Sequence, residues 1–138
     1  MENLALYKIK LVVLWLFFAV STSAGVVLIF MMPGYIGEIM AGALEGVPIS
    51  EGYLLVLALF WLIPLTMAFL SLTLKDSTNR WANIIVGIAL AALHIFSSFR
   101  LLIRGQLTLA LIDGSRTVVA ALIVWYAWKW PKQRIGGD

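Results

Sequence analysis

Residues 93–116 read LHIFSSFRLLIRGQLTLALIDGSR, and this stretch decides how the rest of the chain is interpreted. It contains the chain's only histidine, His94, together with Asp113 and Arg116, in an otherwise apolar setting. Gly105, near its middle, is typical of a tight turn between two helices. Ionisable groups within apolar segments are costly unless they have partners or water, so this hairpin is the place to look for a functional site.

The composition indicates an integral membrane protein. The chain has 138 residues, of which 62% are hydrophobic and 12% are charged, whereas soluble domains average about 45–50% and about 25%. So few charges could not cover the surface of a small soluble protein, but lipid solvates the outside of a membrane protein. The lipid bilayer is therefore the expected partner. The net charge of +3 is small and the basic residues lie beside apolar segments, which excludes a nucleic-acid partner.

The apolar segments predict an all-α fold, an integral membrane four-helix bundle that forms a single domain over residues 1–138. Stretches of about 20 apolar residues match the hydrocarbon core of a bilayer, and four of them are expected at residues 11–31, 53–73, 82–101 and 107–129. Pro33 and Gly34 end the first span, and the spacing of apolar residues over 35–45 predicts a short amphipathic helix at the membrane surface.

The first span has a second interpretation. Lys8 and Lys10, the apolar residues that follow them and the small residues 21–24 resemble a signal peptide with its cleavage site. The apolar run continues to Met32, which favours a retained transmembrane helix.

The distribution of basic residues predicts the orientation. Seven lysines and arginines fall on one side of the predicted membrane, at Lys8, Lys10, Lys75, Arg80, Lys129, Lys132 and Arg134. Because positively charged loops stay in the cytoplasm, both termini are expected there, with the protein multi-pass in the cell membrane. On the same side, four residues are expected to anchor the bundle at the interface: Arg80, Trp81, Trp128 and Trp130. Asn79 is expected to cap the helix that starts there.

Two strings carry a family resemblance. The segment NRWAN over residues 79–83 and the segment WYAWKW over residues 125–130, with Pro33-Gly34 and Ile63-Pro64, resemble a family of small prokaryotic four-span membrane proteins of unknown function. The resemblance covers nearly the whole chain and implies four helices and no assigned chemistry. This chain departs from the family's pattern at Leu62, where relatives often carry an acid, and at Asp76-Ser77, where they often have Tyr-Arg.

The hairpin predicts which charges meet. His94 lies 11 residues before Gly105 and Arg116 lies 11 residues after it, so the two fall at similar depth in an antiparallel pair. Asp113 precedes Arg116 by three residues and shares its face, so the two can pair. Glu38 or Glu45 could meet Arg100 or Arg104 at the outer surface.

Three interpretations of this cluster remain open. The first is a polar pocket that opens outward and binds a ligand through His94, Arg100, Asp113 and Arg116. The second is a structural salt bridge with a neutral, hydrogen-bonded histidine. In the third, the last span starts near Asp113 and these groups lie in a wet turn.

Two classes of function follow. The first is a binding or transport module for an amphiphilic or anionic small molecule or a lipid-like ligand, expected to be homo-oligomeric because four short helices enclose little space. The alternative is a structural or accessory subunit of a larger membrane complex, with no ligand site. The chain has no cysteine and one histidine, so no metal site or cofactor is expected. No nucleophile–base spacing or phosphate-binding glycine loop is present, so an enzyme is not expected.

Overall fold

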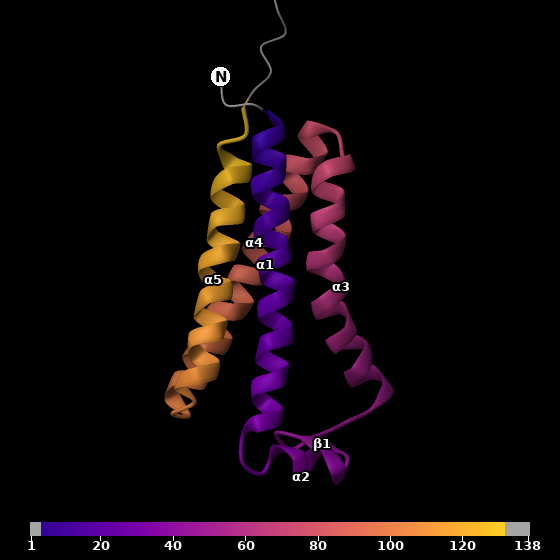
Figure 1. Cartoon of the computed structure of the whole chain (residues 1–138), viewed down its shortest axis with the longest axis vertical. Helices are drawn as coiled ribbons and strands as arrows, with labels where there is room; N and C mark the ends of the chain where they lie inside the picture. Colours follow the sequence, from indigo (N-terminus) through magenta and orange to yellow (C-terminus); the bar gives the residue numbers. More distant parts are fainter. Residues whose placement is uncertain (1–3, 132–138) are drawn as a thin grey trace, which may run out of the picture.

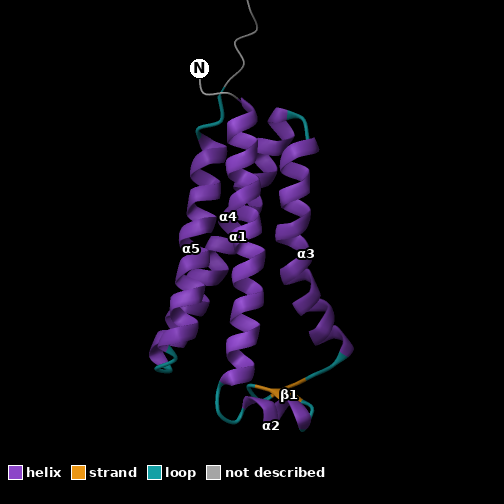
Figure 2. Ribbon diagram, in the orientation of Figure 1, coloured by secondary structure: helices purple, strands orange, loops and turns teal. Residues whose placement is uncertain are grey.

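The computed structural model describes residues 4–131. Four long helices account for most of these residues, together with one short helix and one small hairpin (Figures 1 and 2). In chain order the elements are α1 (Leu4–Met31), α2 (Tyr35–Met40), β1 (Ala43–Leu44), β2 (Val47–Pro48), α3 (Glu51–Thr73), α4 (Asp76–Ile103) and α5 (Leu107–Trp128). The prediction of an all-α four-helix bundle is confirmed.

The long helices form a bundle in which α5 packs against both α4 and α1, and α3 packs mainly against α1. Helix α1 starts and α5 ends at one end of the bundle, which we call the terminal end; α2 and the β hairpin cover part of the other end, the cap end (Figure 1). Helices α1, α3, α4 and α5 are each long and apolar enough to cross a membrane, which indicates a membrane protein.

The turns follow from local chemistry. Gly34 (φ 89°) and Gly105 (φ 72°) adopt left-handed backbone conformations that favour glycine. They separate α1 from α2 and α4 from α5. Ser50 precedes α3, and its hydroxyl accepts a hydrogen bond from the backbone N–H of Tyr53 at 3.3 Å, as expected of a residue that caps a helix.

The surface helix is shorter than predicted. It was expected over residues 35–45, but α2 ends at Met40, and the antiparallel hairpin of β1 and β2 follows. Positive φ angles at Glu45 (50°) and Gly46 (77°) form its two-residue turn. The Glu45 backbone N–H donates to the Glu38 carboxylate at 2.8 Å, which holds the turn against α2.

Helix α4 runs from Asp76 to Ile103 and so extends beyond the predicted span of residues 82–101 at both ends. The predicted cap at Asn79 is wrong, because Asn79 lies inside the first turns of α4 and Lys75 occupies the capping position without a side-chain hydrogen bond.

The core lies where α1, α4 and α5 meet. Its most buried side chains come from one face of α1 and the facing side of α5, among them Leu11, Trp15, Phe18 and Ile123. Gly87 allows α4 to approach α5 closely: a Cβ atom there would lie 2.8 Å from Cγ2 of Val124.

Replacing Gly87 by alanine should therefore destabilise the bundle by about 1–3 kcal/mol, because overpacking forces neighbouring helices apart. Gly114→Ala is the matched control. A Cβ atom at Gly114 meets nothing within 4 Å, so that change should raise stability by about 0.5–1 kcal/mol through helix propensity. Unfolding of both variants in mixed detergent micelles measures the difference. Equal effects at the two glycines would contradict the close α4–α5 contact.

Candidate functional site

Three ionisable side chains meet in the interior of the bundle, and we call them the buried triad. His94 comes from α4, and Asp113 and Arg116 come from successive turns of α5. His94 and Asp113 are each 5% exposed, and the Arg116 side chain is 11% exposed. The structure thus brings together His94 and Arg116, which the hairpin geometry predicted to lie at similar depth, and Asp113, which was predicted to share a face with Arg116.

A single carboxylate oxygen joins the triad. Oδ1 of Asp113 accepts a hydrogen bond from Nη1 of Arg116 at 2.7 Å and lies 3.0 Å from Nδ1 of His94. The predicted pairing of Asp113 with Arg116 at i, i+3 is therefore present. Oppositely charged partners and hydrogen bonds offset much of the cost of placing these groups in an apolar interior.

Helix α1 completes the surroundings of Arg116. Nη2 of Arg116 donates to the backbone carbonyl of Ser21 at 2.6 Å. Gly25, one turn further along α1, leaves room for this approach, since a Cβ atom there would lie 2.5 Å from Nη2. The Phe18 ring meets the His94 ring nearly edge-on at 5.1 Å between centroids. Three helices, α1, α4 and α5, therefore hold the triad.

The contact with an ionised Asp113 favours one tautomer of His94. An ionised carboxylate only accepts hydrogen bonds, so Nδ1 of His94 must carry a hydrogen. In the neutral imidazole, Nε2 is then a hydrogen-bond acceptor. Nε2 is buried and has no hydrogen-bond partner among the described residues, and the same holds for Nε of Arg116.

One further hydroxyl near the triad lacks a partner. Oγ of Ser98, one turn along α4 from His94, is buried without a hydrogen bond within residues 4–131. Three other buried atoms in this condition belong to residues close to helix ends, namely Arg80, Gln106 and Trp130. Of the side-chain nitrogens and oxygens that the structure describes away from helix ends, the buried unpartnered ones thus belong to the triad and to Ser98.

Arg100 was predicted to join the ligand-binding set, but the structure does not bring it to the triad. It is exposed on α4, with its guanidinium 5.9 Å from the centre of the Phe96 ring. Arg104 instead pairs with Glu45, and its Nη1 lies 3.2 Å from Oε2. This pair is one of the alternatives that the sequence predicted for the outer surface.

The Arg104–Glu45 pair belongs to a polar contact between the β hairpin and the α4–α5 turn. Glu45 also accepts from the Tyr35 hydroxyl at 3.1 Å, and Gln106 donates to that hydroxyl at 2.9 Å. Burial raises the pKa of Tyr35, so this hydroxyl stays protonated at neutral pH and can donate. These hydrogen bonds connect α2 and the β hairpin to the turn between α4 and α5.

The four predicted anchors lie at the terminal end in two arrangements. The Arg80 guanidinium is within 6 Å of two exposed indole rings, 5.9 Å from Trp81 and 5.8 Å from Trp128. Trp130 differs from the other two indoles, because it is 7% exposed and packs at 6.5 Å from the Tyr7 ring.

A second buried polar cluster was not anticipated from the sequence. Asn83 accepts from Nε1 of Trp15 at 2.6 Å and donates to Oδ1 of Asn79 at 2.7 Å. Asn79 donates to the backbone carbonyl of Ser71 at 2.7 Å. These four residues, the asparagine network, link α1, α3 and α4. The available signal was the pair of asparagines at i, i+4 spacing on an apolar helix.

An open apolar groove lies on the hairpin of α4 and α5. Its volume is about 460 Å³, and its lining residues are Leu102, Leu107, Ala110, Leu111, Gly114, Ser115 and Val118. None of the triad residues lines it. Within the described part of the chain, no group of three or more His, Cys, Asp or Glu residues could hold a metal ion.

Comparison with known protein families gives a match over nearly the whole chain. The family described as "Family of unknown function (DUF6326)" matches residues 4–137. No match was found among the curated proteins or the solved structures.

Proposed function

The chain belongs to this family of unknown function, and from its own residues we propose that it binds a small anionic or amphiphilic molecule at the buried triad, either for transport or as a binding module. The single observation that carries the proposal is a pair of buried nitrogens that have no hydrogen-bond partner in the described part of the chain, Nε2 of His94 and Nε of Arg116. Ionisable groups inside an apolar bundle are expensive, and they commonly mark a ligand or ion site.

The asparagine network provides an internal comparison. It is as deeply buried as the triad, and no side-chain nitrogen or oxygen of Trp15, Ser71, Asn79 or Asn83 is among the unpartnered atoms of the described residues. A cluster with a purely structural role is expected to satisfy its polar atoms in this way. The triad leaves two nitrogens on charged or titratable side chains unsatisfied, which supports a ligand that completes them.

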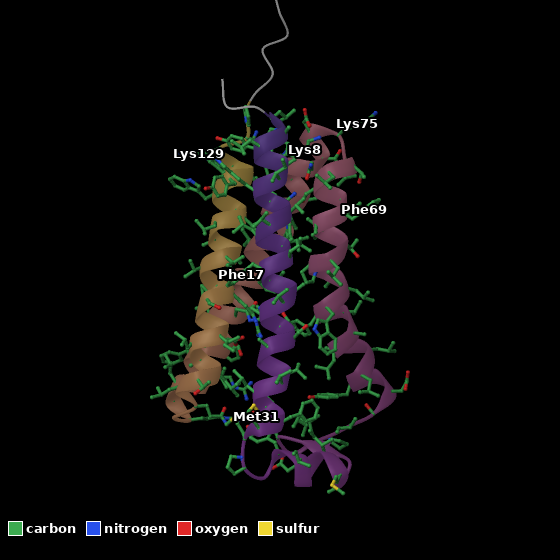
Figure 3. All side chains as sticks on the ribbon, viewed as in Figure 1. Lys8, Phe17, Met31, Phe69, Lys75 and Lys129 are labelled. Atoms are coloured by element: carbon green, nitrogen blue, oxygen red, sulfur yellow. The ribbon has the colours of Figure 1, made fainter. Side chains whose placement is uncertain are left out.

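The proposed location is the cell membrane, with both termini in the cytoplasm. Lys8, Lys75 and Lys129 gather at the terminal end, and exposed aromatic side chains such as Phe17 and Phe69 lie on the sides of the bundle (Figure 3). The cap end carries three acids, Glu38, Glu45 and Glu51, alongside Arg100 and Arg104. The excess of positive charge at the terminal end favours the cytoplasmic side for that end.

Thermal unfolding of the purified protein tests the proposal. The probes are six-carbon alkyl chains that carry a carboxylate, a phosphate or an ammonium group. At least one of them should raise the Tm of the wild-type protein, because a ligand that binds only the folded state stabilises it. Arg116→Lys keeps the positive charge beside Asp113 but removes Nε, so it should abolish the rise.

The matched control is Arg104→Lys, which makes the same change in an exposed ion pair and should keep the rise. If Arg116→Lys also keeps it, the triad is not the ligand site. Equally, an Arg116→Leu variant that folds more stably and still responds to the probe would favour a structural salt bridge.

One observation favours a second candidate, an accessory subunit or a homo-oligomer. All the buried residues of α3, namely Pro64, Met67, Ala68 and Ser71, lie in its half near the terminal end. The half of α3 before Pro64 is left without a buried residue, so a helix of another chain could pack there. Co-purification in a mild detergent distinguishes a larger complex from a second copy of this chain.

A further inference from the structure

We infer that the buried triad binds a monocarboxylate together with one proton, with the proton held on Nε2 of His94. This inference rests on the proposed function, since it names the ligand class and the coupling of the same site. It follows from the tautomer of His94, the charge balance of the triad and the apolar residues around it.

The tautomer of His94 determines which hydrogen-bond donors and acceptors the neutral site presents to a ligand. With Nδ1 donating to Asp113, the unpartnered Nε2 of neutral His94 is an acceptor, whereas the unpartnered Nε of Arg116 is a donor. A carboxylate has only acceptor oxygens, so it can bond to Nε of Arg116 but meets a lone pair at Nε2. One proton on Nε2 forms an N–H bond and converts this nitrogen into a second donor.

The charge balance requires the anion and the proton together. Asp113 and Arg116 form a pair with no net charge, so a proton on His94 alone leaves one uncompensated positive charge in the interior. A monoanion alone leaves one negative charge. Bound together they add no net charge, which is the least costly state in an apolar environment. A dianion such as a phosphate monoester would leave one negative charge even with the proton.

Among residues 4–131, no other charged group faces His94 to change this balance. Helix α1 contributes the Phe18 ring and a backbone carbonyl, and residues 11–31 contain no ionisable side chain. Helix α3 carries ionisable groups only at Glu51 and Tyr53, in its first turn. On α4 the next charged residue is Arg100, which is exposed. Asp113 and Arg116 of α5 are therefore the charged groups that set the state of His94.

The surroundings favour a ligand with an apolar tail. Phe18 packs on the His94 ring, and Ile112 lies beside Gly25 and the Arg116 guanidinium. The hydrophobic core contributes Leu90 and Val119, one turn from His94 and Arg116. A short alkyl carboxylate matches this combination of two donors and apolar neighbours.

Calorimetric titration of the full-length protein with hexanoate tests the inference. The titration is carried out in a nonionic detergent at neutral pH, in two buffers that differ in ionisation enthalpy. The buffer dependence of the binding heat should show uptake of about one proton for each hexanoate bound, because anion and proton binding are reciprocally linked. Wherever binding takes up one whole proton, the Kd should rise roughly tenfold for each pH unit.

His94→Gln cannot take up a proton, so its proton uptake should fall to zero and its hexanoate binding should weaken. Glu45→Gln, which alters an exposed carboxylate, should leave both unchanged. Hexanoate that binds without proton uptake, or a site that binds hexylammonium in place of hexanoate, overturns this inference but leaves the proposed function standing. Absence of saturable binding by hexanoate, hexyl phosphate and hexylammonium overturns both.

Discussion

Replacing Asp113 by asparagine should destabilise the folded bundle by about 3–5 kcal/mol, which is the usual effect of removing one partner from a buried ion pair. Asparagine keeps the shape of the side chain but cannot neutralise the buried Arg116 guanidinium, whose Nη1 lies 2.7 Å from Oδ1 of Asp113. The variant also loses the charged acceptor of His94. Reversible unfolding in mixed micelles of a nonionic detergent and SDS measures the change.

Two further variants test whether the loss of stability comes from the buried, unneutralised charge. Replacing both Asp113 and Arg116 by leucine removes the pair together, and it should recover most of the lost stability, since hydrophobic replacement of a buried ion pair is often neutral or stabilising. Glu45→Gln breaks the pair with Arg104, whose side chains are 47% and 37% exposed, and should cost about 0–1 kcal/mol. Similar losses in Asp113→Asn and Glu45→Gln would contradict the burial of the triad.

The second large effect is expected at Asn83, the centre of the asparagine network. Asn83→Leu leaves Nε1 of Trp15 and Oδ1 of Asn79 without their partners in a site that is fully buried. Each buried polar atom left unsatisfied costs about 1–3 kcal/mol, although hydrogen bonds measured in one membrane protein average roughly 0.6 kcal/mol. A loss of about 2–4 kcal/mol is expected on these grounds.

Thr73→Val is the control for Asn83→Leu. The Thr73 hydroxyl donates to the Phe69 carbonyl at 3.2 Å at an exposed position of α3, so its loss should change stability by less than about 0.5 kcal/mol. In Asn83→Leu the Trp15 indole should also change its fluorescence, because Nε1 loses its acceptor. A variant with wild-type stability and an unchanged spectrum would mean that the network does not join α1 to α4.

The four long helices could be predicted from the sequence because each depends on one property, a run of apolar residues long enough to cross a bilayer. The β hairpin could not. Its turn residues are Glu45 and Gly46, whereas Asn-Gly or Asp-Gly would be the usual signal, and its strands are two residues long. The apolar spacing over 35–45 continued past Met40 and favoured a helix.

The triad could be predicted in part for a similar reason. The turn at Gly105 fixes the relative depth of His94 and Arg116, and i, i+3 spacing places Asp113 beside Arg116. The role of α1 could not be predicted, because its contribution is the Ser21 backbone carbonyl and the missing side chain of Gly25. Small residues four positions apart, such as Ser21 and Gly25, usually indicate helix packing. The exposed position of Arg100 depends on the rotation of α4, which the charge pattern does not define.

The asparagine network shows the same limit more clearly. Asn79 and Asn83 are one turn apart on α4, which a sequence can show, but their partners Ser71 and Trp15 come from α3 and α1. Such partners depend on how three helices are rotated and packed. Local patterns therefore predicted elements and pairs within the last hairpin, and they missed contacts across the bundle.

The buried triad is tested most directly by measuring which ring nitrogen of His94 carries a hydrogen. His94 is the only histidine, so nitrogen NMR of the ¹⁵N-histidine-labelled protein, freed of any purification tag, gives signals from this one ring. We predict that, without ligand, Nδ1 carries the hydrogen that is bound to Asp113. Asp113→Asn should remove this preference. A ring protonated at Nε2 and not at Nδ1, or one that exchanges freely between tautomers in the wild-type protein, would contradict the triad and the ligand site built on it.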